Sequence, residues 1–296
     1  CGHDGHTAIG LGVAKLLSAQ REHLAGRVKF VFQPAEEIAR GAQAMIDDGA
    51  LANPSPDVCM GLHLWNTLPV GEVGIVDGPT MAGCDIFGIT IRGVGGHGGI
   101  PDKATDPLVA GAQIVMALQT IVSRNVSPLD TAVVSVTMFH AGETDNVISP
   151  VAELRGTFRT FRPQTRDLVE RRLREIATGI AASMGCQAEV EVVSLTPPLS
   201  NDAATNARLR QAFSHLTNGT GPHPVHLRAD SQTMAAEDMA VFLQKIPGTF
   251  LLVGSSNAAR ELNYPHHHPR FDFDEDVLPL ATGLLATAVA DYVLRE

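Results

Sequence analysis

The first eight residues, CGHDGHTA, constrain this chain more than any other stretch. A thiol, two imidazoles and a carboxylate lie within six positions, at Cys1, His3, Asp4 and His6, and two glycines allow the backbone to turn tightly around them. Cysteine and histidine together bind Zn²⁺-like metals strongly enough to displace water. A polar loop that happens to contain histidines is the alternative, and the stretch alone leaves both interpretations open.

The composition is that of a folded protein with room for two domains. Of 296 residues, 44% are hydrophobic and 18% are charged. A net charge of -10 argues against nucleic acid or an anionic membrane as a partner, and no apolar run reaches the length of a membrane span. Four scattered cysteines favour a reduced, cytoplasmic protein. Because the chain begins with Cys rather than Met, we expect upstream residues to be missing.

Helix and strand patterns alternate after the opening loop. The expected elements are a helix at 7–20, a strand at 27–32, a helix near 41–51 and a strand at 57–65. Such alternation indicates an α/β domain with a largely parallel sheet. Sites in these sheets form beyond the carboxyl ends of strands, which is where Glu36, Glu37 and His63 would lie.

The order of elements changes near residue 81. The expected elements are strands at 85–92, 132–141, 152–161 and 187–194, with helices at 106–123 and 164–184. The order βαββαβ is the ferredoxin-like arrangement of two helices on one antiparallel sheet, so we expect an inserted second domain. The first domain then resumes, and its expected elements are helices near 202–216, 236–245 and 277–294, a strand near 249–253 and a turn-rich loop at 219–224.

Three further features could carry chemistry. Glu36 and Glu37 are adjacent, so one can ligate a metal while the other takes a proton, although a solvated acidic pair at a helix entrance is the simpler interpretation. His63 has apolar neighbours, and such a histidine is more often a core residue than a ligand. Three consecutive histidines at 266–268 lie between prolines, where a solvated loop is the alternative.

A glycine-rich stretch at 93–98, GVGGHG, fits the dinucleotide motif G-x-G-x-x-G after an expected strand. A nucleotide site would need a helix that begins at the third glycine. Instead, Ile100, Pro101 and Asp102 continue a loop, which argues against a nucleotide. A histidine among these glycines, His97, is either a solvated loop residue or a group presented to a partner surface, and the stretch alone leaves both open.

Seven motifs follow one another along the whole chain: CGHDGHTA, FQPAEE, GLHLW, GGHGG, NVI, AEDM and HHPRFDFDED. In this order they resemble the amidohydrolase branch of the aminoacylase/carboxypeptidase metallopeptidases, which includes hippurate hydrolases, other N-acyl-amino-acid amidohydrolases and indole-acetyl-amino-acid hydrolases. The resemblance is strongest to the hippurate-hydrolase type. It implies an α/β fold with a layered catalytic domain at 1–80 and 197–296, lacking its amino-terminal part. Residues 81–196 would be a ferredoxin-like α+β lid and dimerisation domain.

The resemblance also implies roles for single residues. Two divalent ions (Zn, Mn, Co or Ni) would be held by the residues that match the family's ligands: Cys1, His3, Glu37, His63 and His267. Glu36 matches the general base, which takes a proton from a metal-activated water and returns it to the leaving amine. His97 matches a residue that reaches across a dimer interface to stabilise the oxyanion. Asn146 and Arg159 resemble residues that bind the substrate's carboxylate and carbonyl.

Two positions depart from the family pattern. His268 stands where a small or polar residue is usual, so three imidazoles compete for one role. His267 is favoured because the family's spacing puts the ligand two residues before the proline. Met239 replaces the usual aromatic residue after Glu-Asp and would reshape the pocket wall.

The resulting expectation is a cytoplasmic, homodimeric, metal-dependent amidohydrolase that cleaves hippurate-like N-acyl amino acids. One alternative is a small-peptide carboxypeptidase or dipeptidase with the same centre. Another is a catalytically silent homologue that binds a metal or ligand. The intact Glu36 favours an enzyme, because a silent homologue needs no free carboxylate beside the ligands.

Overall fold

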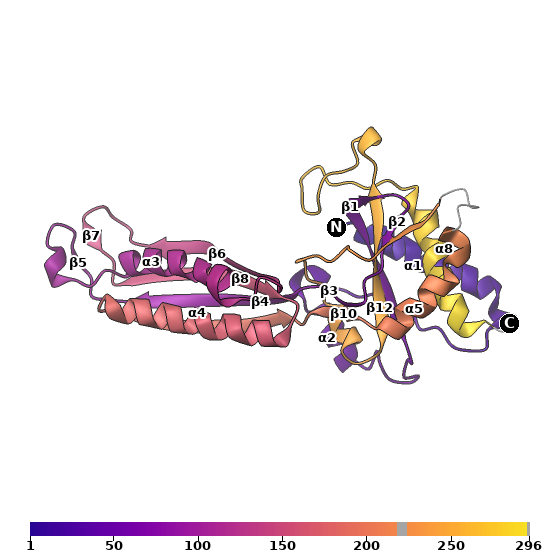
Figure 1. The fold of residues 1–296 in the computed structure, drawn as a ribbon, viewed down its shortest axis with the longest axis horizontal. Helices are drawn as coiled ribbons and strands as arrows, with labels where there is room; N and C mark the ends of the chain where they lie inside the picture. The colour runs from indigo at the N-terminus through magenta and orange to yellow at the C-terminus, as the bar shows by residue number, and fades with distance from the viewer. Residues whose placement is uncertain (218–223, 295–296) are drawn as a thin grey trace. The chain divides into compact units, whose positions relative to one another are not determined.

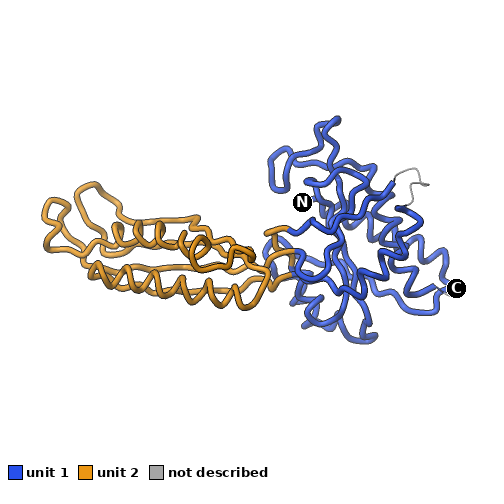
Figure 2. Tube along the Cα trace, viewed as in Figure 1, with its two compact units in different colours: residues 1–80, 199–232, 238–296 blue, residues 81–198, 233–237 orange. Residues whose placement is uncertain are grey.

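A computed structural model describes residues 1–217 and 224–294, which form two compact units. Unit 1 consists of Cys1–Thr80, Leu199–Gln232 and Asp238–Glu296, and unit 2 of Met81–Pro198 and Thr233–Glu237 (Figure 2). Unit 2 is therefore an insertion in unit 1, supplemented by one short later segment. The turn-rich loop expected at 219–224 lies outside the described residues except for Pro224.

Unit 1 is built on a four-stranded sheet of order β1-β12-β2-β11 (Figure 1). Its strands are β1 (Cys59–Pro69), β2 (Glu72–Gly74), β11 (His226–Arg228) and β12 (Gly248–Ser256). β1 and β12 run parallel, with Cys59 opposite Gly248 and His63 opposite Leu252. β12 is buried over almost its whole length, as expected for an inner strand with both faces covered. A second, two-stranded sheet pairs β3 (Gly78–Met81) with β10 (Leu199–Asn201).

Helices pack on the sheet of unit 1. They are α1 (His3–Ala19), α2 (Gly41–Asp47), α5 (Ala203–Ala212), α6 (Ser214–Thr217), α7 (Ala240–Leu243) and α8 (Val277–Val293). α1 buries Ile9, Val13 and Leu17, whose spacing of four places them on one face, in the same apolar cluster as Leu64 of β1. This cluster fixes α1 against both β1 and α8. None of the helices in the described part of the chain is long and apolar enough to span a bilayer.

Unit 2 is a four-stranded antiparallel sheet of order β6-β8-β4-β9, with two helices (Figure 1). The elements are β4 (Gly83–Arg92), β5 (Gly96–His97), α3 (Pro107–Thr120), a π-helical turn (Ile121–Asn125), β6 (Ala132–Ala141), β7 (Val147–Ile148), β8 (Val151–Thr160), α4 (Pro163–Ser183) and β9 (Gln187–Thr196). Short β5 and β7 pair separately from the main sheet. The order of the longer elements, βαββαβ, gives the ferredoxin-like topology. The role of this unit as a lid and dimerisation domain stays a prediction.

Some expected elements of unit 1 differ from those observed. Residues 27–32, expected as a buried strand, are extended but unpaired in the described chain, and Phe30, Val31 and Phe32 are 39–47% exposed. Their β-branched and aromatic side chains favour a strand, but a strand forms only where a neighbour accepts its hydrogen bonds. The first helix begins at His3 rather than residue 7, and the helix expected at 236–245 is only α7, one turn long.

Gly41 allows a tight turn that carries the two adjacent glutamates. The turn is the 3₁₀ helix Glu36–Ile38, flanked by Ala35 and Ala39, which both have a φ of 54° in the left-handed region. A Cβ atom on Gly41 would lie 1.5 Å from the backbone oxygen of Pro34. Because a backbone oxygen cannot move aside as a side-chain end can, only glycine fits here.

Gly41→Ala should therefore lower the free energy of unfolding by about 1–3 kcal/mol or more, since the added methyl forces the turn away from α2. The control is Gly283→Ala on α8, where a Cβ atom meets nothing within 4 Å. There, helix propensity should stabilise the protein by about 0.5–1 kcal/mol. Urea denaturation measures both values. Equal unfolding free energies for the two variants would contradict this account of Gly41.

Candidate metal centre

Helix α1 presents two histidines on one face, next to the thiol of Cys1. Gly2 caps the helix in the left-handed conformation, with a φ of 82° that glycine adopts without strain. His3 and His6 follow, and because residues three apart share a helix face, their ring centroids lie 5.5 Å apart. The opening motif is thus the start of a helix and not the expected loop.

Strand β1 supplies the third imidazole, His63, which is 6% exposed. Its Nδ1 lies 2.6 Å from the backbone oxygen of Leu64. A carbonyl oxygen only accepts hydrogen bonds, so Nδ1 carries a proton, and in the neutral ring Nε2 therefore keeps its lone pair. This is the tautomer that a metal-binding histidine needs when its second nitrogen is held by the backbone.

The two adjacent glutamates approach the histidines from the turn that Gly41 permits. We expected them at the end of a buried strand, but they lie on the 3₁₀ helix that follows an unpaired extended segment. Glu36 Oε2 lies 3.6 Å and Glu37 Oε1 3.7 Å from His3 Nε2. The second oxygen of Glu37, Oε2, lies 3.2 Å from His267 Nε2. Glu37 therefore contacts both His3 and His267. Of these two histidines, Glu36 contacts only His3.

The structure separates the three consecutive histidines. His267, with a left-handed φ of 65°, reaches Glu37. His266 turns its ring towards Trp65, with the centroids 4.7 Å apart. His268 stacks on Tyr264 at 4.7 Å and 13°, and its Nδ1 accepts the N–H of Arg270. Of the three, His267 is the one in a donor cluster, which supports the choice made from spacing.

Donor atoms at this site form two groups that share Cys1. One is Cys1, His3 and His63, and the other is Cys1, Glu37 and His267, with the atoms of each group within 4.8 Å of one another. His3, Glu36 and Glu37 form a third, overlapping group. Thiol, imidazole and carboxylate donors at this spacing fit divalent transition metals, and the thiol of Cys1 is common to two of the groups. The structure therefore brings together all five predicted ligands and Glu36.

The electrostatics of the site favour bound cations. Burial, followed by the charges of Glu37 and Asp238, raises the pKa of Glu36 to about 7. Burial lowers the pKa of His63 to about 3, although its hydrogen bond to Leu64 opposes this shift. His63 is therefore neutral, the form in which imidazole binds metals. Gathered carboxylates beside neutral imidazoles are an arrangement that positive ions stabilise.

The remaining predicted residues, His97, Asn146 and Arg159, all belong to unit 2. His97 is exposed on β5, and its Nδ1 accepts the N–H of Gly99 at 3.0 Å. The N–H of Gly98 donates to the backbone oxygen of Asn146 at 2.8 Å, so Asn146 lies beside the His97 loop. Arg159 lies on β8, opposite Cys84 of β4. Their roles in oxyanion and substrate binding stay predictions.

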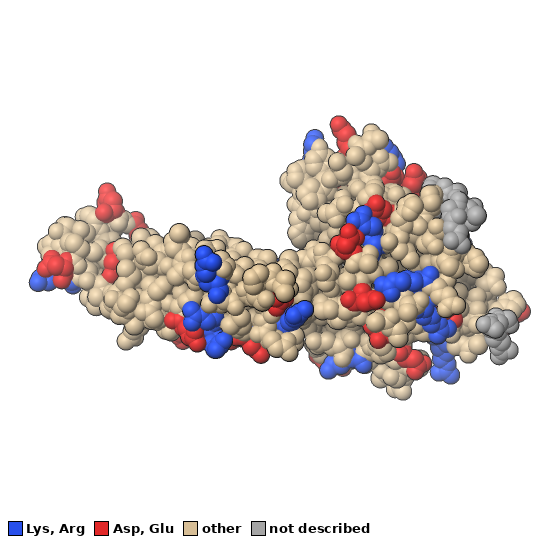
Figure 3. All heavy atoms as spheres, viewed as in Figure 1, with Lys and Arg blue, Asp and Glu red and all other residues tan. Residues whose placement is uncertain are grey.

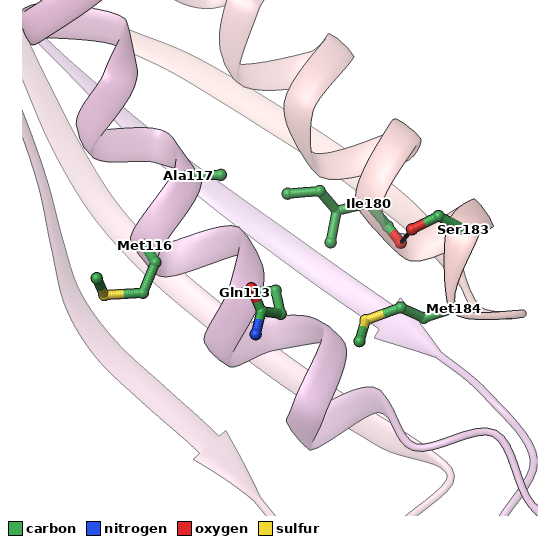
Figure 4. Close-up of a pocket in the computed structure, with 6 residues that line it drawn as sticks. All are labelled: Gln113, Met116, Ala117, Ile180, Ser183 and Met184. Atoms are coloured by element: carbon green, nitrogen blue, oxygen red, sulfur yellow. Dashed lines mark hydrogen bonds between the residues drawn. The ribbon is translucent and has the colours of Figure 1, made fainter.

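The surface outside the centre has mixed charges. On the face drawn in Figure 3, Lys and Arg side chains lie close to Asp and Glu side chains. Salt bridges such as Arg208–Asp291 and Arg228–Glu72 pair opposite charges in unit 1. A hollow between α3 and α4 is lined by Gln113, Met116, Ala117, Ile180, Ser183 and Met184 (Figure 4). Its lining includes no histidine, cysteine or acidic side chain, so it offers none of the ligand types found at the candidate centre.

Two histidines at the centre received no role from the sequence. His6 Nε2 accepts the backbone N–H of Leu64 at 2.9 Å, and His266 Nε2 accepts that of Asn66 at 3.3 Å. Burial lowers the pKa of both, that of His266 to about 4. The second histidine of CGHDGH and the first of HHH are visible in the sequence, but which nitrogen meets a backbone amide depends on the folded structure.

The sequence pattern of peptidase family M20/M25/M40 matches residues 1–291. An N-acetylcysteine deacetylase of Bacillus subtilis (strain 168) is 43% identical over 286 residues, which are 97% of this chain and 72% of that protein. The IAA-amino acid hydrolase ILR1-like 4 of Arabidopsis thaliana is 35% identical over 295 residues, 100% of this chain and 66% of that protein. Thermostable carboxypeptidase 1 of Saccharolobus solfataricus is 34% identical over 292 residues, 98% and 71% of the two chains.

A solved structure with the same fold is the Bacillus subtilis YXEP protein, described as a dinuclear metal-binding peptidase of the M20 family. It superposes with a TM-score of 0.82 at 35% identity, covering 99% of this chain and 72% of that one. The chain thus spans between 66% and 72% of the length of these four proteins.

The shared position of Cys1 generates a prediction about metal content. Cys1→Ala should remove both ions, because both donor groups lose a ligand, whereas His267→Ala should remove one. The metal-to-protein ratio after dialysis against Zn²⁺, measured by mass spectrometry, distinguishes the two. His268→Ala is the matched control and should keep both ions. A Cys1→Ala protein that also keeps both would show that the thiol does not serve two sites.

Proposed function

The chain belongs to peptidase family M20/M25/M40, and on that premise we propose that it hydrolyses the amide bond of N-acyl amino acids, using two divalent ions at the candidate centre. One observation carries the proposal: two donor groups share Cys1, and the carboxylate of Glu36 belongs to neither of them but lies beside both, in the third group with His3 and Glu37. A purely structural metal site has no use for an additional carboxylate beside its ligands. Zn, Mn, Co and Ni all suit this donor set.

The roles of the chain's own residues follow from their positions. Cys1, His3, Glu37, His63 and His267 would hold the ions, which supply Lewis acidity that polarises the amide carbonyl and makes water nucleophilic at neutral pH. Glu36 is half-buried, lies 3.6 Å from His3 and has its pKa raised to about 7. A carboxylate so placed can take the proton of the attacking water and give it to the leaving nitrogen.

The substrate class is supported by the names of the relatives. N-acetylcysteine and IAA-amino acids are both N-acyl amino acids, and hippurate belongs to the same class. The carboxypeptidase among the relatives favours a second candidate, the release of a carboxy-terminal amino acid from a small peptide at the same centre. Both reactions break an amide next to a free carboxylate, so they differ only in what lies on the acyl side.

Unit 2 is proposed to act as a lid and to form a homodimer. Its exposed His97 sits on a glycine-rich loop, with Nδ1 accepting a hydrogen bond and Nε2 free to donate one. In this role His97 stabilises the oxyanion in the partner subunit's site, and Asn146 and Arg159 bind the carboxylate and carbonyl of the substrate.

A substrate panel tests the proposed function. The full-length protein, loaded in turn with Zn²⁺, Mn²⁺, Co²⁺ or Ni²⁺, is offered hippurate, N-acetyl amino acids, indole-acetyl amino acids and dipeptides. The proposal expects kcat/KM to be higher for N-acyl amino acids than for dipeptides. The reverse order would establish the peptidase instead, and no turnover of any substrate with any metal would indicate a silent homologue.

Glu36→Gln should lower kcat by at least about 10²-fold while metal content stays near that of the wild type, because the amide keeps the shape of the side chain but cannot take a proton. The neighbouring Glu37→Gln is the matched control. Since Glu37 belongs to a donor group that includes Cys1, this control should lose metal as well as activity. Retention of more than about a tenth of kcat in Glu36→Gln would exclude Glu36 as the general base.

Heterodimers test the proposed exchange of His97 between subunits. His97→Ala and Glu36→Ala proteins, each inactive alone, should recover part of the activity when mixed, since one of the two sites then combines an intact Glu36 with an intact His97. Differently tagged subunits allow the heterodimer to be purified before kcat is measured. His140→Ala, another exposed histidine of unit 2, should stay active by itself. Verified heterodimers without recovery would place His97 outside the partner's site.

A further inference from the structure

Strand β1 carries the candidate ligand His63, and two histidines that are not ligands contact the edge of this strand. The N–H of Leu64 donates to His6 Nε2 at 2.9 Å, and the N–H of Asn66 donates to His266 Nε2 at 3.3 Å. Amides two residues apart point to the same edge of a strand. In the described residues, β12 pairs with the other edge of β1 and no strand pairs with this one. The two imidazoles therefore satisfy backbone donors that a neighbouring strand would otherwise bind.

We propose that His6 is a positioning residue of the metal centre, which holds Leu64 so that Leu64 in turn orients the ligand His63. The backbone of Leu64 is bound at both of its polar groups by imidazoles. Its N–H donates to His6, and its carbonyl oxygen accepts from His63 Nδ1 at 2.6 Å. A shift of Leu64 would thus turn the ring of His63 and move its Nε2 away from Cys1 and His3. The inference rests on the proposed function of this centre.

The hydrogen-bond pattern requires one particular form of His6. A backbone N–H only donates, so His6 Nε2 must carry a lone pair and Nδ1 must carry the ring's single proton. Protonated His6 would present an N–H to an N–H and lose the contact. His63 has the same tautomer for the opposite reason, since its Nδ1 donates to a carbonyl. The contact of His6 thereby requires a neutral imidazole, whereas that of His63 requires only a proton on Nδ1; the two ring centroids lie 4.4 Å apart in an edge-to-face arrangement.

The close approach of α1 to β1 makes this contact available. A Cβ atom on Gly5 would lie 2.8 Å from Leu64 Cδ1 and 2.9 Å from Phe273 Cζ, and both side chains are buried. Glycine at this position allows the helix to lie directly on Leu64, with His6 next to the amide. One helix face therefore presents His3 to the candidate metal site and His6 to the strand that carries His63.

Two substitutions of His6 distinguish the effect of its hydrogen-bond acceptor from the effect of its ring shape. His6→Phe keeps a planar ring but removes the acceptor, whereas the side-chain oxygen of His6→Gln can still accept the amide of Leu64. Zn²⁺ affinity of the full-length protein, measured by competition with a chromophoric chelator, should fall about 10–100-fold in His6→Phe, the range typical for residues that orient metal ligands. His6→Gln should retain most of the wild-type affinity.

Val13→Ala controls for a loss of stability alone. Val13 lies on the buried face of the same helix, is 1% exposed, and has an aliphatic side chain that can neither ligate a metal nor accept a hydrogen bond. This variant should unfold more easily but bind Zn²⁺ as tightly as the wild type. If it lost affinity as His6→Phe does, the effect of His6 would be one of stability and the proposal would be overturned.

Nitrogen NMR of the imidazoles tests the tautomer directly in the metal-free wild-type protein, even if His6→Phe does not fold. The expected spectrum has the proton of His6 on Nδ1 and a lone pair on Nε2. A proton on Nε2, or wild-type Zn²⁺ affinity in His6→Phe, would overturn the positioning role but leave the centre intact. A wild-type protein that binds no Zn²⁺ would overturn the proposed centre itself.

Discussion

The packing of helix α1 on strand β1 is the contact on which the candidate metal centre depends. α1 contributes His3, β1 contributes His63, and Cys1 precedes the helix by two residues. Apolar residues of both elements belong to one buried cluster, so the hydrophobic effect that stabilises unit 1 also sets the distance between the imidazoles. The two remaining ligands then reach this fixed pair from a short turn and from the loop after β12.

The sequence predicts best those elements whose formation depends on their own residues rather than on a partner elsewhere in the chain. In unit 2, the strands are runs of β-branched and apolar residues, β8 alternates between buried and exposed positions, and α4 buries one apolar face. The expected elements at 85–92, 132–141 and 164–184 therefore lie within two residues of those observed. Residues 27–32 have the same strand-like composition, but pairing depends on a neighbour elsewhere in the chain. Composition reports what a segment prefers, whereas the available partner decides what it forms.

The candidate site divides in the same way. The motifs predicted which residues could donate to a metal and in what order they occur along the chain. The structure places the five predicted ligands and Glu36 together. The different contacts of His266, His267 and His268 could be predicted only in part. Motif spacing favours His267 as the ligand but does not predict what the other two contact. The hydrogen bond that His6 accepts from Leu64 could not be predicted, since it joins residues 58 apart in the chain, at an edge of β1 that no other strand pairs with in the described residues.

The backbone of the site is strained where its acidic and histidine ligands are presented. Ala35, Ala39 and His267 have φ values of 54°, 54° and 65°, a left-handed conformation that costs a residue other than glycine of the order of 1–3 kcal/mol. Such strain persists only if the surroundings hold it, as Gly41 does for the turn of Glu36 and Glu37. The turn also holds the carboxylates of Glu36 and Glu37 close together, and the repulsion between like charges opposes folding further. Bound cations would offset both costs, because a ligand that binds only the folded state stabilises that state. The same left-handed residues and gathered carboxylates that bring the donor atoms together would thus make the folded state more stable with cations than without them.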